Sequence, residues 1–123
     1  MNKILEIGRW LFPLSFLLYV GLHFSKADVG AEFVPDYIPF PYFWNYFTGI
    51  CILAFIVSAL IKKYDKLAYT LMAFYVLLVG VLVHFPNAGT DENEMLNVFR
   101  NIMVTGALLG FAKYIAKDQR VIG

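Results

Sequence analysis

The sequence predicts an all-α membrane protein, a bundle of four transmembrane helices, and two observations carry this prediction. Residues 37–61 contain no charged side chain, nor do residues 67–90, and only the short segment 62–66 separates the two runs. Each run is long enough to cross a bilayer as a helix. Of the 123 residues, 60% are hydrophobic and 15% are charged, with a mean hydropathy of +0.66. A soluble domain of this size is far more polar.

Four spans are expected, at about residues 4–24, 42–61, 67–85 and 98–116, in one domain covering 1–123. The first resembles a secretory signal, but Glu6 lies where such signals are purely basic, which favours a retained helix. Glu6 and Arg9 are spaced to neutralise each other on that helix. The fourth follows the acidic segment 91–94, in which three of the four residues are acids suited to cap its N-terminus. The proline-rich segment 33–41 requires an extended or turning path.

The basic residues predict the orientation. With both termini inside, eight of the ten lysines and arginines face the cytoplasm, and the two outer loops are mainly acidic. The positive-inside rule therefore predicts an N-in, C-in, multi-pass protein, with the inner (cytoplasmic) membrane of a bacterium as the simplest location. The basic residues placed inside are Lys3, Arg9, Lys62, Lys63, Lys66, Lys113, Lys117 and Arg120.

Composition also excludes several functions. A net charge of +1 argues against nucleic acid as a partner. The single cysteine, Cys51, excludes a disulfide or a cysteine-based metal site within one chain. No nucleophile–base pair, phosphate loop or metal motif is recognisable, so no catalytic residue or metal ligand is predicted, and enzyme activity stays open. Electron transfer would require a borrowed cofactor.

The two halves of the sequence share short motifs. Leu22-His23-Phe24 ends the first span and Val83-His84-Phe85 ends the third; Asn45 and Asn101 lie at the starts of the second and fourth spans. Each asparagine is followed by a Thr-Gly pair, 48–49 and 105–106. Parallel hairpin repeats occur in membrane proteins, so an internal duplication and chance recurrence are both open.

Several of these motifs also resemble those of a known family. Gly21-x-His23-Phe24, Val34-Pro35-x-x-Ile38-Pro39-x-Pro41, the tryptophan Trp44 and Gly49 resemble the DoxX-like family of small four-helix membrane proteins, and His84-Phe85-Pro86-Asn87-Ala88 is similar to that family's phenylalanine-proline-asparagine segment. The resemblance implies the four-helix architecture and a link to quinone-reducing sulfur oxidation. Arg100 and the acids 91–94 do not match the family pattern.

His23 and His84 are the two histidines, and both are predicted at the outer boundary. They suit hydrogen bonding to a quinone carbonyl, a proton relay, or shared ligation of a haem iron. The structural alternative is that each bonds to a loop carbonyl or a carboxylate. Asp36 and Arg100, also outer, predict an ion pair across the bundle mouth, or an arginine that holds an anionic headgroup.

The aromatic segment 33–47, which includes Trp44, suits either a pocket for a flat lipophile or an interfacial belt. The predicted ligand-binding residues are therefore His23, Asp36, Trp44, His84, Asn87 and Arg100.

Two functions remain open. In one, the chain is an accessory or quinone-binding subunit of a membrane redox pathway, with its site at the outer face. In the other, it is a structural subunit that uses small-residue ridges, such as Gly106-x-x-x-Gly110, to pack within its own bundle, against a second copy or against a larger membrane complex. In both, the lipid bilayer is its immediate partner.

Overall fold

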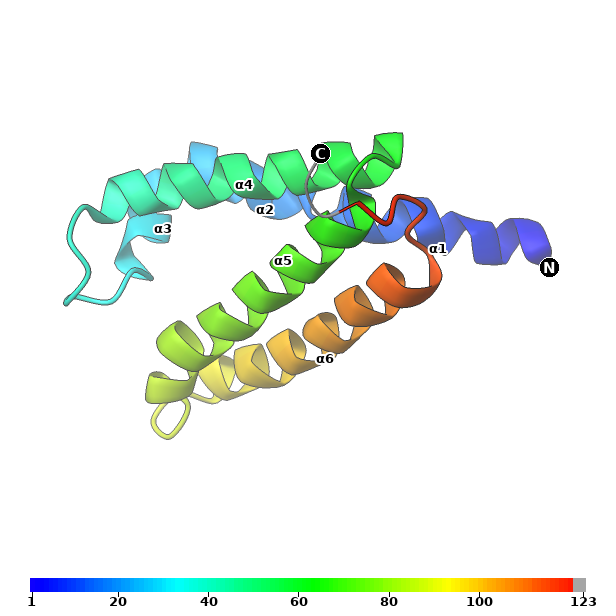
Figure 1. Cartoon of the computed structure of the whole chain (residues 1–123). Helices are drawn as coiled ribbons and strands as arrows, with labels where there is room; N and C mark the ends of the chain where they lie inside the picture. The colour runs from blue at the N-terminus through cyan, green and yellow to red at the C-terminus, as the bar shows by residue number, and fades with distance from the viewer. Residues whose placement is uncertain (121–123) are drawn as a thin grey trace. The chain divides into compact units, whose positions relative to one another are not determined.

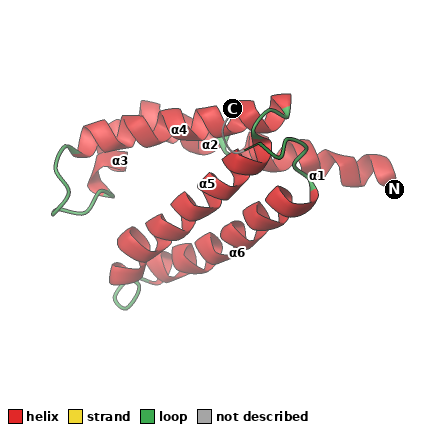
Figure 2. Ribbon diagram, viewed as in Figure 1, coloured by secondary structure: helices red, strands yellow, loops and turns green. Residues whose placement is uncertain are grey.

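The computed structural model describes residues 1–120, and within that range the chain is helical with no strand (Figure 2). Four helical stretches are long and apolar enough to cross a membrane: Asn2–Ser25, Pro41–Ile61, Asp65–Asn87 and Glu92–Tyr114. This confirms the predicted fold class and the four spans. The fourth begins six residues earlier than predicted and ends two earlier. The N-in, C-in orientation stays a prediction.

The chain divides into two compact units, residues 1–63 and residues 64 onward. In Figure 1 the first unit runs from blue to green and the second from green to red. Each unit is a helical hairpin whose two arms pack along each other: α4 lies against α1 and α2, and α5 lies against α6. A membrane-spanning hairpin satisfies its backbone hydrogen bonds internally, which lipid requires.

In the first unit, the first span is two helices rather than one, α1 (Asn2–Ser15) and α2 (Leu17–Ser25). Pro13 has no N–H to donate, and the chain tightens after it, where the Phe16 N–H bonds to the Pro13 carbonyl at 3.2 Å. Phe16 is buried against Phe55 of α4, with ring centroids 5.1 Å apart. Near the start of α1, Glu6 and Arg9 form the predicted ion pair at 3.6 Å.

Between the arms of the first unit lies a short helix that the sequence did not predict, α3 (Ala27–Glu32). Lys26 separates it from α2 with non-helical backbone angles, φ −126° and ψ 52°. The proline-rich segment then breaks the helical path, as predicted, until α4 (Pro41–Ile61) begins at a proline. α3 packs against α4, beside α2 (Figure 1).

The connector between the units is shorter than predicted. α4 ends at Ile61 and α5 (Asp65–Val79) begins at Asp65, so three residues join them. Lys62 and Tyr64 adopt left-handed backbone angles, with φ of 60° and 56°. This strained turn is tight enough to make Asp65 the first residue of α5 rather than part of the loop.

In the second unit, α5 continues as a π-helical segment, η1 (Gly80–His84), and a 3-10 turn, η2 (Phe85–Asn87). A loop then leads to α6 (Glu92–Tyr114). The Asp91 carboxylate accepts a hydrogen bond from the Asn93 N–H at 2.9 Å, which confirms that an acid caps this helix. Gly80 allows close packing: a Cβ there would lie 3.1 Å from Asn101 Cβ.

The segment after α6 folds back onto the start of α5. Asp65 is buried, and its carboxylate accepts hydrogen bonds from the N–H groups of Lys66 (3.0 Å), Lys117 (2.8 Å) and Asp118 (2.8 Å). The Asp118 carboxylate accepts from the Tyr64 N–H at 2.7 Å and pairs with Arg120 at 2.8 Å. We call this arrangement of Tyr64, Asp65 and residues 117–120 the C-terminal clasp.

Candidate functional site

His23 and Asn45 join α2 to α4 by two reciprocal hydrogen bonds. His23 Nδ1 lies 2.8 Å from the main-chain carbonyl oxygen of Asn45, and Asn45 Nδ2 donates to the main-chain carbonyl of His23 at 2.7 Å. Thr48 Oγ1 lies 3.3 Å from the same His23 nitrogen, and Thr48 donates to the carbonyls of Trp44 and Asn45. The pairing is local to the first unit and leaves the imidazole half-buried.

This geometry determines the tautomer of His23. A carbonyl oxygen can only accept, so Nδ1 must carry the hydrogen. In the neutral imidazole Nε2 then holds a lone pair and acts as an acceptor. Within residues 1–120 the hydrogen bonds of the His23 ring are made by Nδ1 and none by Nε2. His23 can therefore accept a hydrogen bond from a hydroxyl or N–H group of a ligand.

Close packing surrounds this pair. Gly49 lies under His23, because a Cβ at Gly49 would come within 3.0 Å of His23 Cβ and 3.2 Å of the Phe24 ring. Gly30 of α3 lies against the Asn45 side chain, where a Cβ would collide with Oδ1 and come within 2.8 Å of Cγ. Asn45 is 2% exposed. Glycines on two elements thus let the backbone approach the two polar side chains.

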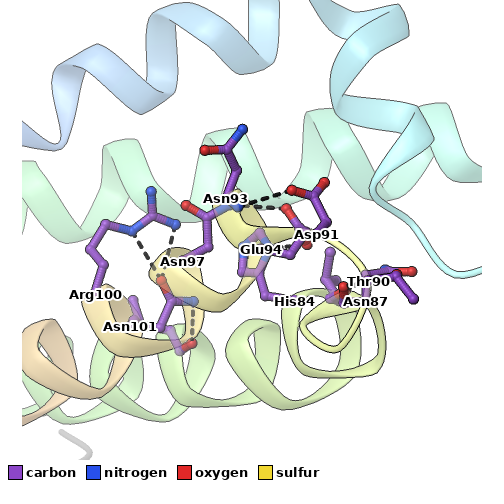
Figure 3. A network of polar contacts seen from close by, with 11 residues as sticks. His84, Asn87, Thr90, Asp91, Asn93, Glu94, Asn97, Arg100 and Asn101 are labelled. Atoms are coloured by element: carbon purple, nitrogen blue, oxygen red, sulfur yellow. Dashed lines mark hydrogen bonds and ion pairs between the residues drawn. The ribbon is translucent and has the colours of Figure 1, made fainter.

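His84 has a different partner in the second unit. Its Nδ1 lies 2.8 Å from Glu94 Oε2, and Asn97 Nδ2 donates to Glu94 Oε1 at 3.0 Å (Figure 3). Both side chains are mostly buried, with 7% of His84 and 13% of Glu94 exposed. A carboxylate oxygen accepts, so Nδ1 carries the hydrogen here too. His84 lies in the π-helical segment, and such segments redirect side chains by adding a residue to a turn.

Asn101 is the counterpart of Asn45 in the second unit. It is 6% exposed, and its Nδ2 donates to the main-chain carbonyl of Val76 at 3.0 Å. Thr105 donates to the Asn101 carbonyl, as Thr48 does to the Asn45 carbonyl. Each unit is thus joined by a buried asparagine that donates to the backbone of the opposite helix. The two asparagines differ in their partners. The Asn45 side chain bonds to the carbonyl of His23 itself, whereas the Asn101 side chain bonds to the carbonyl of Val76, eight residues before His84.

The other predicted residues lie as follows. Asp36 is exposed in the first unit and Arg100 is exposed in the second, where it donates to Asn101 Oδ1 at 3.1 and 3.2 Å. Their ion pair stays a prediction, as does shared haem ligation by His23 and His84, because each pair has one member in each unit. Asn87 donates to the Val83 carbonyl at 3.0 Å and closes the end of its own helix.

Trp44 is one of several exposed rings along one face of α4. It contacts Phe43 and Phe47 with centroids 5.1 and 5.9 Å away, and Phe43 stacks on Phe47 at 5.8 Å. Rings that contact one another on an exposed helix face are typical of an interfacial belt. Phe43 and Phe47 each lie two residues before Asn45 and Gly49, which face His23, and two residues correspond to about 200° around a helix, so these two rings face away from His23.

Three residues of these sites are not among the ligand-binding residues that the sequence predicts: Asn45, Glu94 and Gly30. In the sequence Asn45 stands out only as part of the repeat, although a side-chain amide inside an apolar run is itself a signal, because lipid makes an unpaired amide costly. The predicted fourth span begins at about residue 98, which places Glu94 in the loop before it, whereas α6 begins at Glu92. Nothing in the sequence indicates that Gly30 approaches Asn45.

Within residues 1–120, no three His, Cys, Asp or Glu side chains gather closely enough to hold a metal ion. The polar groups described above can hold and orient a ligand or a proton. No protein-family model matches the chain, and no curated protein or solved structure is significantly similar to it.

Proposed function

We propose that the chain is a DoxX-like protein of a bacterial inner membrane that binds a lipophilic molecule of the quinone class at the outer ends of its helices. It would serve a membrane redox pathway as an accessory or carrier subunit. The positive-inside pattern supports the orientation, and the family resemblance supports the class of ligand.

The observation that carries the proposal is the fixed tautomer of His23. Its Nδ1–H donates to the Asn45 carbonyl, so Nε2 is presented as an acceptor. An acceptor of this kind inside an otherwise apolar membrane protein suits a ligand that is apolar over most of its surface and carries a few hydroxyl or N–H groups.

The test is mass spectrometry of organic extracts from protein purified in mild detergent, comparing the wild type with His23→Ala and His84→Ala. We expect a quinone or quinol enriched with the wild type and with His84→Ala, and lost from His23→Ala. The backbone carbonyl to which Asn45 donates remains in the His23→Ala variant, so the hairpin keeps that bond. Only ordinary phospholipid in all three samples would refute the proposal, and visible absorption would reveal a haem instead.

A structural subunit is the second candidate, and one observation favours it. A Cβ added to Gly106 or Gly110 would have no atom within 4 Å, so the small-residue ridge of α6 is not filled by the opposing helix α5. Such ridges let helices approach closely in membranes. A stable partner at fixed stoichiometry, lost on Gly106→Leu and indifferent to His23→Ala, would favour this function over ligand binding.

A further inference from the structure

The two ends of the buried Asn45 amide have different surroundings. Nδ2 donates to the His23 carbonyl at 2.7 Å, but Oδ1 has no hydrogen-bond partner in residues 1–120. Turning the amide over would place its oxygen against the His23 carbonyl oxygen, so the observed orientation is the one that the hydrogen bond requires. Native proteins pair nearly all buried acceptors, and an unpaired one calls for an explanation.

α3 covers this oxygen. Gly30 lies directly against Oδ1, and any Cβ at that position would collide with it. α3 is held by little apolar surface, because Ala31 is its one buried residue and Val29 is 45% exposed. The non-helical Lys26 separates α3 from α2, and the turns of 33–40 separate it from α4. α3 can therefore move away from α4 while α2 and α4 stay folded.

We propose that Asn45 Oδ1 is a second ligand-binding acceptor and that α3 is the lid above it. When α3 lifts, a hydroxyl or N–H group of the ligand donates to Oδ1 in place of the apolar contact with Gly30. The identity of the ligand rests on the proposed function; the movement of α3 does not.

The same geometry assigns a preference between redox forms. His23 Nε2 and Asn45 Oδ1 both accept, Asn45 Nδ2 is used by the His23 carbonyl, and the Thr48 hydroxyl donates to main-chain carbonyls. The ligand must therefore supply the hydrogens. A quinol has two hydroxyl donors, whereas the quinone has only acceptors, so the site selects the reduced form.

The lid is tested by hydrogen exchange of the α3 amides in the purified full-length protein. Gly30→Ala forces α3 off Asn45, and we expect its amides to exchange at least tenfold faster. Gly21→Ala is the matched control, because a Cβ at Gly21 meets nothing within 4 Å and should leave α3 unchanged. Equal exchange of α3 in Gly30→Ala, Gly21→Ala and the wild type would overturn the lid.

The acceptor assignment is tested on the wild type without any substitution. The probes are a decyl-substituted benzoquinol, kept reduced, and its dimethyl ether, which has the same shape but no donor. We expect the quinol to bind about tenfold or more tightly, because the ether leaves a buried acceptor unpaired. The quinol should also speed exchange of α3.

The two failures can be told apart. Equal affinities of quinol and ether overturn the acceptor assignment, even if the His23-dependent lipophile found in extracts upholds the proposed function. If neither probe binds and extracts contain only phospholipid, the proposed function and the assignment both fail. Faster α3 exchange in Gly30→Ala would then show a mobile helix without a ligand site.

Discussion

Asp65 and Asp118 join the start of α5 to the segment after α6, because the carboxylate of each accepts a hydrogen bond from a backbone N–H of the other segment. Asp65 accepts from the Asp118 N–H at 2.8 Å, and Asp118 accepts from the N–H of Tyr64, the neighbour of Asp65, at 2.7 Å. Residues more than fifty apart in sequence are joined in this way. The clasp lies at the opposite end of the hairpin from His84 and Glu94, so its integrity can be tested separately from any ligand site.

Replacing Asp65 by asparagine should open the clasp. The variant loses the charge and turns one acceptor oxygen into a donor that faces a backbone N–H. Hydrogen bonds to charged groups contribute about 1.5–3 kcal/mol, so we expect the free energy of unfolding to fall by roughly 2 kcal/mol. Thermal unfolding in detergent measures this, and hydrogen exchange of 117–120 locates it. The control is Glu92→Gln, at an exposed position in the first turn of α6, which should lower the free energy of unfolding by only a small fraction of that amount. Equal losses of stability in the two variants would contradict the role of Asp65.

The clasp should stay closed over the whole physiological pH range. Arg120 first, then the Tyr64 N–H, hold the pKa of Asp118 well below its ordinary value of 3.8. A depressed carboxyl pKa stabilises the folded state at every pH above the ordinary value, and the contribution is lost only as the pH falls through the folded value. Acidification from pH 7 to pH 5 should therefore leave Asp118 ionised.

Carbon NMR of the Asp118 carboxyl, followed through an acid titration, checks this prediction. In Arg120→Gln the pKa of Asp118 should rise toward 3.8, because the largest cause of its depression is removed. Identical titration curves for the variant and the wild type would show that Arg120 does not hold the carboxylate.

Alanine at two corresponding glycines should have opposite effects. Gly49 lies under His23 and Phe24, with a Cβ contact of 3.0 Å, so Gly49→Ala forces α2 away from α4 and should cost about 1–3 kcal/mol. Gly106, at the matching place in α6, meets nothing within 4 Å. Gly106→Ala should be neutral or stabilise by up to about 1 kcal/mol through helix propensity. Unfolding in detergent compares them; equal effects would mean that the two hairpins are packed alike.

Removing the Glu94 carboxylate should release His84. In Glu94→Ala the buried His84 Nδ1–H loses its partner, and we expect a loss of about 1–3 kcal/mol in stability. Nitrogen NMR of the imidazole should show that the Nδ1–H tautomer is no longer the dominant neutral form. Asn93→Ala, on the exposed side of the same turn, is the control and should leave that signal in place.

Hydropathy and charge were sufficient to predict the fold class, the four spans and the ion pair of Glu6 with Arg9. This works because lipid excludes unpaired backbone, and a long run without charges therefore has few alternatives to a helix. The prolines around Pro39 correctly marked a break, since their missing N–H ends a helix locally.

The tertiary structure alone decided which polar groups meet. The two histidine motifs have similar sequences, yet His23 bonds to a main-chain carbonyl and His84 bonds to Glu94. They differ because the π-helical segment and the earlier start of α6 change which group faces each imidazole. The approach of Gly30 to Asn45 and the burial of Asp65 likewise depend on residues distant in sequence. Periodicity reports the face that a residue occupies on its own helix, whereas its partner is set by the register between helices.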